Sequence, residues 1–115
     1  MNERRQTGEE ISDDDVFEMS NLTPAQTGLA YRIWIRVNVH QRPQRPRLCV
    51  EEPKRTFYPM SIDEPVEFLA GQPPGMSEAQ LRDLQGFVAL NREALLAHWD
   101  DQIDTKEALD RIRPI

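Results

Sequence analysis

The sequence is poor in the residues on which many small enzymes and metal proteins depend. Its 115 residues include one cysteine and two histidines. A single cysteine, Cys49, excludes a disulfide within the chain and a metal site with four thiolate ligands. No phosphate-binding glycine loop is present, and the Gly-x-Ser-x-Gly pattern of serine hydrolases is missing as well. We therefore expect no cofactor, no bound metal and no catalytic residue, and we predict that the chain is not an enzyme.

Long hydrophobic runs are also missing. No apolar stretch approaches the roughly 18–20 residues that cross a membrane. Arg4 and Arg5 lie near the N-terminus, but the apolar segment that would follow them in a signal peptide is absent. We expect a protein of the cytoplasm of a bacterium, or of an agent that infects one, with no membrane contact.

What the sequence has in abundance is charge, and the charge is divided into three blocks. Residues 1–20 carry seven acidic and two basic side chains, residues 21–56 carry seven basic and two acidic ones, and residues 57–115 carry eleven acidic and five basic ones. Clustered like charges repel one another, so a basic block between two acidic blocks favours a surface with a binding role.

The first acidic block contains few side chains to bury. Its apolar residues close to the domain are Ile11, Val16 and Phe17. Burying so little surface would not offset the entropy lost on ordering the chain, so residues 1–19 are predicted to be a disordered acidic tail. A single domain is then predicted over residues 20–115. The alternative for the tail is a short amphipathic turn at its C-terminal end, packed on a partner or on its own domain.

The clearest secondary-structure signal is the alternation of apolar and polar side chains over residues 31–39. A period of two predicts a strand whose odd positions face the core. The even positions then lie together on the opposite face: Arg32, Trp34 and Arg36. Further strands are predicted over residues 47–51, 56–62 and 65–69, with the prolines of the last two placing them at an edge or a bulge of the sheet.

The C-terminal half has the pattern of helices. Ser77 and Gln80 form a capping-box pattern, and apolar residues at 3–4 spacing predict a helix from there to about Trp99. Asp104 begins a last short helix that ends before Pro114. The fold class predicted is α+β, with a small antiparallel sheet of three to four strands packed against a long helix and a short C-terminal helix.

Two polar residues of the long helix have structural interpretations. Asn91 lies on its apolar stripe, where a buried amide requires partners, so we predict a clamp to a backbone edge, with a binding role as the alternative. His98 lies at the C-terminal end of the helix, where the helix dipole favours a protonated imidazole. The acidic run 100–104 resembles a calcium loop but lacks its glycine and its terminal glutamate, so no metal site is predicted there.

The candidate binding face combines six residues of the basic block: Arg32, Trp34, Arg36, Arg42, Arg45 and Arg47. The guanidinium fork matches two oxygens of a carboxylate or phosphate at once, and an interleaved tryptophan offers a stacking surface. We expect a protein partner, with nucleic acid as a second possibility. The alternative is that the long helix covers this face, which would place Trp34 in the core and pair its arginines with acids of the helical half.

The function predicted is that of a non-enzymatic binding protein, regulatory or inhibitory, acting through the strand face that carries these arginines and Trp34. A rival hypothesis is a small ribonuclease-like toxin that uses His40 and the nearby arginines, because such chemistry requires proton-transfer groups beside a phosphate-binding cation. A third is an acidic mimic of nucleic acid, of phage or mobile-element origin, in which the acidic blocks do the binding.

From Ser20 on, the chain resembles small uncharacterised bacterial proteins that are often encoded on mobile or accessory DNA. The stretches that carry the resemblance are residues 20–29, the Arg/Trp strand, and residues 87–105. The last stretch is also similar to the C-terminal helix of short domains of unknown function found near toxin–antitoxin genes. That family has a His-containing stretch after its first strand, which only His40 matches here. The resemblance implies no established activity and no catalytic residues.

Overall fold

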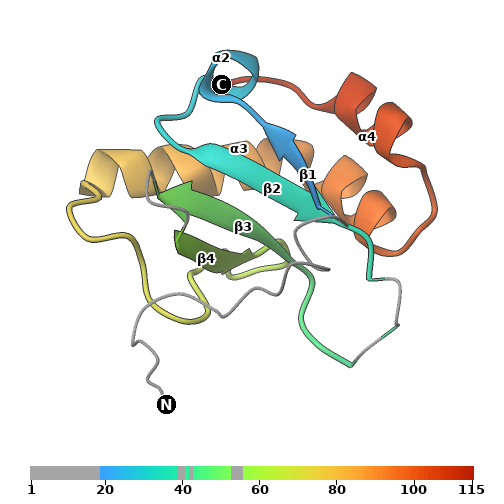
Figure 1. Ribbon diagram of the computed structural model, residues 1–115, viewed down its shortest axis with the longest axis horizontal. Helices are drawn as coiled ribbons and strands as arrows, with labels where there is room; N and C mark the ends of the chain where they lie inside the picture. The colour runs from blue at the N-terminus through green and yellow to red at the C-terminus, as the bar shows by residue number, and fades with distance from the viewer. Residues whose placement is uncertain (1–18, 39–40, 42, 53–55) are drawn as a thin grey trace.

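The protein has an α+β fold, seen in a computed structural model that describes residues 19–38, 41, 43–52 and 56–115 (Figure 1). The predicted fold class is confirmed. Four strands form the sheet: β1 (Met19–Leu22), β2 (Arg32–Arg36), β3 (Arg47–Glu52) and β4 (Thr56–Ser61). Three helices accompany it: α2 (Pro24–Thr27), α3 (Glu78–Trp99) and α4 (Thr105–Arg111).

The sheet is antiparallel throughout, and its strands follow one another in chain order from β1 to β4. Pro59 therefore lies in a strand with no further named strand beside it, as its missing N–H requires. The strand expected over residues 65–69 is reduced to a single bridge between Met60 and Phe68. This short pairing covers the outer edge of β4, where Leu69 donates to the Pro59 carbonyl at 2.9 Å.

The core lies between the sheet and α3, which runs behind the sheet in Figure 1. The odd positions of β2, Ile33 and Ile35, are 0% and 2% exposed, so the predicted strand register is confirmed. From α3 the buried apolar side chains are Leu84, Phe87, Val88, Ala94, Leu95 and Trp99. This arrangement leaves Arg32, Trp34 and Arg36 on the face of the sheet turned away from α3.

Local capping sets the bounds of the helices. The Ser77 hydroxyl accepts from the Gln80 N–H at 3.1 Å, and the Gln80 side chain accepts from the Ser77 N–H at 2.9 Å. Asp104 accepts from the Glu107 N–H at 2.8 Å and begins α4 in the same way. Both helix starts are therefore where the sequence predicts them.

The bounds of the strands differ from the prediction most at β1 and β2. Met19, placed in the tail by the sequence, is the first residue of β1 and is 7% exposed, because β1 pairs with β2 from Met19 opposite Arg36 to Leu22 opposite Ile33. Strand β2 ends at Arg36 rather than at Val39, since the Asn38 N–H donates to the Trp99 carbonyl at the end of α3. Residues 1–18, for which disorder is predicted, lie outside the described part of the chain.

Candidate functional site

The candidate site is the sheet face turned away from α3, which we call the Arg/Trp face. Strand register assigns its members, because residues directly opposite one another point to the same side of the sheet. Met19 is opposite Arg36, Asn21 opposite Trp34, Arg32 opposite Glu51, and Trp34 opposite Cys49. The described residues of the Arg/Trp face from β1 to β4 are Met19, Asn21, Arg32, Trp34, Arg36, Arg47, Cys49, Glu51, Phe57, Pro59 and Ser61.

Arg32 is held in place at both sides of its strand. Its guanidinium donates to the Asn21 side-chain oxygen on β1 at 2.6 Å. Towards β3, its Nε lies 3.8 Å from the Glu51 carboxylate, in a loose ion pair. The Arg32 side chain remains 42% exposed, whereas that of Glu51 is 12% exposed. The Arg32 guanidinium is therefore accessible to solvent while its position is held by Asn21 and Glu51.

Trp34 lies between this polar pair and a small apolar cluster. Its indole N–H donates to the Glu51 carboxylate at 2.7 Å, and its ring meets Phe57 edge to face at a centroid distance of 6.0 Å. The buried members of the cluster are Met19, Cys49 and Phe57. Trp34 itself is half-buried. One carboxylate, Glu51, thus orients both the tryptophan and the neighbouring arginine, a link between strands that the sequence analysis did not identify.

Arg36 lies where the sheet meets the end of α3. Its guanidinium carbon is 5.9 Å from the centroid of the Trp99 ring, within the range of a cation–π contact. Trp99 is 3% exposed and belongs to the buried face of α3. The contact between Arg36 and Trp99 therefore connects the Arg/Trp face to the C-terminal end of α3.

The remaining predicted members are placed differently. Arg45 donates to Asp63 at 2.8 Å, to Glu67 at 2.7 Å and to the Pro65 carbonyl at 2.7 Å, so it clamps the loop before β3 to the segment after β4. Arg47 is in register with Ser61 at the start of β3 and donates to the Arg45 carbonyl at 3.1 Å. Arg42 and His40 lie outside the described residues.

Arg32 and Arg45 form ion pairs with acids that lie outside the helical half. Arg32 pairs with Glu51 of the neighbouring strand, and Arg45 pairs with Asp63 and Glu67. Neither contact involves Asp83 or Glu93. Trp34 is half-buried against its own sheet face rather than buried under α3.

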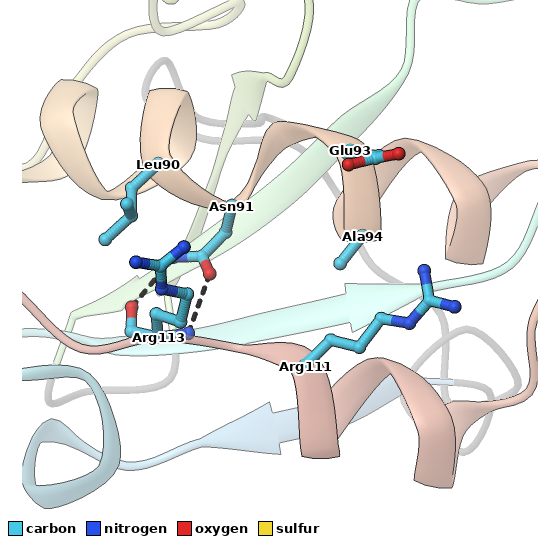
Figure 2. A pocket seen from close by; sticks show the side chains of 6 residues that line it. All are labelled: Leu90, Asn91, Glu93, Ala94, Arg111 and Arg113. Carbon is cyan, nitrogen blue, oxygen red and sulfur yellow. Dashed lines mark hydrogen bonds between the residues drawn. The ribbon is translucent and has the colours of Figure 1, made fainter.

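The C-terminal segment is fastened to α3 by Asn91, as the sequence predicts. The Asn91 amide donates to the Phe87 carbonyl at 3.0 Å and to the Arg113 carbonyl at 2.9 Å, and its oxygen accepts from the Arg113 N–H at 2.7 Å. Figure 2 shows this clamp beside a cleft of about 160 Å³ that Leu90, Glu93 and Arg111 also line. The predicted clamp to a backbone edge is confirmed.

Residues 112–115, which we call the strap, are held at two points. Asn91 binds the backbone of Arg113, and the last residue, Ile115, binds α2. The Ile115 N–H donates to the Thr27 carbonyl at 2.9 Å. Gly28, at φ +82°, allows this close approach, because a Cβ there would lie 2.7 Å from the Ile115 oxygen. The strap therefore connects α2 to α3 across the whole length of residues 112–115.

His98 has a structural role, but not as a cation. It is 2% exposed, and its Nε2 lies 3.0 Å from the Thr105 hydroxyl at the start of α4. Burial lowers the pKa of the imidazole, against smaller opposing effects of Asp101, the Arg36 main chain and Asp104. The expectation of a protonated imidazole at this position is therefore wrong, because burial disfavours the charged form and lowers the pKa of His98.

This burial predicts a pH dependence of stability. Between the ordinary imidazole pKa of about 6.5 and the lower pKa of folded His98, the unfolded chain binds a proton that the folded chain does not. The free energy of unfolding should therefore fall as the pH is lowered from about 7.5 to about 5.5. His98→Gln should flatten this dependence in urea titrations at several pH values. His40→Gln, at the other histidine of the chain, is the matched control, and an equal flattening by both variants would contradict the prediction.

No group of three or more His, Cys, Asp or Glu in the described part of the chain is placed to hold a metal ion. None of its helices is both long and apolar enough to cross a membrane.

Comparison with known proteins adds no relative. No family model, no curated protein and no solved structure matches this chain. The likeness to small bacterial proteins of accessory DNA remains a prediction from the sequence.

Proposed function

We propose that this chain is a non-enzymatic binding protein of the bacterial cytoplasm that regulates or inhibits a macromolecular partner through its Arg/Trp face. The observation that carries the proposal is the arrangement of Arg32 and Trp34 around Glu51. The carboxylate accepts the indole N–H at 2.7 Å and lies 3.8 Å from the Arg32 Nε, while the Arg32 side chain stays 42% exposed.

Such an arrangement suits recognition of an anionic group beside an apolar one. The Arg32 guanidinium has five N–H donors, and Asn21 and Glu51 fix its position without covering it. A fixed side chain loses less rotamer freedom when a partner binds, so more of the contact energy contributes to affinity. Arginine and tryptophan are also the residue types most enriched among the energetic centres of protein interfaces.

The experiment is a capture of partners with the full chain as bait, in lysate of the cells that produce the protein. Arg32→Ala should reduce capture of each specific partner by about fivefold or more, since contacts of interface arginines often account for over 1 kcal/mol. Arg82→Ala on α3 is the matched control, because Arg82 also makes one loose pair, with Glu78 at 3.9 Å, and is 69% exposed. Both variants should unfold within about 1 kcal/mol of the parent.

Two results would overturn the proposal. Equal capture by Arg32→Ala and Arg82→Ala would show that the Arg/Trp face is not the binding surface. Cleavage of RNA by the parent that His40→Ala abolishes, with folding and capture intact, would favour the ribonuclease-like alternative instead.

A further inference from the structure

The outward side of α3 exposes a large apolar side chain beside charges of both signs. Leu90 is 43% exposed, and in the described part of the chain Ile115 is the other large apolar side chain that is exposed. Leu90 borders the cleft of about 160 Å³ that Glu93, Arg111 and Arg113 also line (Figure 2). Exposed apolar surface with polar surroundings is the composition found at the centre of protein interfaces.

Two charged groups of this cleft make no ion pair with the described residues, namely the Glu93 carboxylate and the Arg113 guanidinium. Arg111, in contrast, pairs with Glu107 at 2.6 Å. The main chain of Arg113 is fixed by its two hydrogen bonds to Asn91, at 2.9 Å and 2.7 Å, while its side chain is exposed. An anion and a cation of one cleft are therefore both available to another molecule.

Gly86 leaves room on the same side of the helix. Residues 86, 90 and 93 are separated by four and three positions, so they share one face of α3. Glycine in a helix interior is less favourable than alanine. Among the described residues, however, a Cβ at the exposed Gly86 would meet no atom of another segment within 4 Å. The packing of this chain therefore does not require a glycine here, whereas the close approach of a second molecule would use the open space.

We propose that α3 packs antiparallel on α3 of a second copy of this chain, around a two-fold axis beside Leu90. A two-fold contact of this kind requires a patch that is complementary to itself. Glu93 lies about 4.5 Å along the helix axis from Leu90. The two-fold axis places Glu93 of the second copy on the other side of Leu90, next to Gly86. Arg113, which lies beside Leu90 and Asn91 in Figure 2, is on hand there to pair with it.

The charge of the patch favours a second copy over a strongly charged partner. The acids Glu93 and Glu107 balance the bases Arg111 and Arg113, so this patch has no net charge. Each chain carries −6, and two copies repel one another over most of their surfaces, so they meet most favourably where the charge is balanced. An acidic peptide or a nucleic acid would be attracted by Arg113 but repelled by Glu93. The Arg/Trp face is turned away from α3 and has no part in this contact.

Self-association of the full chain is measured by sedimentation equilibrium over a range of concentrations. We expect a dimer with a dissociation constant in the micromolar range, because one helix per copy forms a small interface. Glu93→Arg and Arg113→Glu should each raise the dissociation constant by about tenfold or more, since each places like charges opposite one another twice. Gly86→Gln should weaken the dimer by filling the open space. Lys106→Glu on α4 is the matched control, because it reverses one charge on a side chain that is 87% exposed, and it should have no effect.

Mixing the two charge variants supplies the decisive comparison. Glu93 and Arg113 both have exposed side chains, so each variant should retain the circular dichroism of the parent. An equimolar mixture should form a heterodimer, because the arginine introduced in one chain then faces the glutamate introduced in the other, and the native Glu93 faces the native Arg113. A parent that stays monomeric up to millimolar concentration would overturn the proposal. A dimer that the variants do not weaken, or a mixture no more associated than its components, would do the same.

Discussion

Leu84→Ala is expected to lower the free energy of unfolding by about 2–5 kcal/mol. Leu84 is 1% exposed and lies on the buried stripe of α3, in the same core cluster as Ile33 and Ile35 of β2. Truncation removes apolar surface that was buried and leaves a cavity between helix and sheet, which the packed core closes only in part. Urea denaturation followed by circular dichroism measures the change.

Leu90→Ala is the control for this substitution. It removes the same atoms from the same helix, but Leu90 is 43% exposed, so its loss should stay within about 1 kcal/mol. Equal losses for Leu84→Ala and Leu90→Ala would mean that the buried face of α3 is assigned incorrectly.

Asn91→Ala is expected to cost about 2–4 kcal/mol, although it removes only a small polar side chain. Asn91 is 3% exposed, and its amide makes three hydrogen bonds to the backbone of Phe87 and Arg113. Without the amide, the N–H and carbonyl of Arg113 lose their partners at a part-buried position, and the strap formed by residues 112–115 detaches from α3. Hydrogen exchange of the Arg113 amide should accelerate together with the fall in stability.

Gln85→Ala provides the comparison for a single contact. Gln85 is on the same helix and donates one hydrogen bond to the Val66 carbonyl at 3.1 Å, so its loss should be about 0.5–1.5 kcal/mol. Slow exchange of the Arg113 amide in Asn91→Ala would show that the strap does not depend on this side chain.

The elements predicted correctly from the sequence are those with local signals. The alternation around Ile33 and Ile35 reports one buried face directly, and the capping residues Ser77 and Asp104 mark helix starts through bonds to neighbours three residues away. Asn91 was identifiable because a polar side chain on an apolar stripe requires partners.

Elements that form only because they pair with residues far away in the sequence have no local signal, so the sequence did not predict them. Strand β1 has only four residues, of which Met19 and Leu22 are apolar, so its sequence has no strong alternation. It is a strand because β2 supplies its hydrogen-bonding partner. The role of Glu51 has the same origin, since the register between β2 and β3 places it beside Arg32 and Trp34.

The candidate site is partly visible in the sequence for the same reason. A shared strand places Arg32, Trp34 and Arg36 on one face from their spacing alone. The three contacts of Arg45 with residues 63–67 depend on how two loops meet, and the sequence contains no signal for this.

The strap at the C-terminus has a mechanical consequence. A force applied at Ile115 first loads its single bond to Thr27 and then the two bonds between Asn91 and Arg113. These hydrogen bonds would break sequentially, before the force reaches the paired strands of the sheet. Pulled from this end, the molecule should release the strap first, and α4, whose Ala108 is buried in the core, should resist next, while β1 to β4 stay intact.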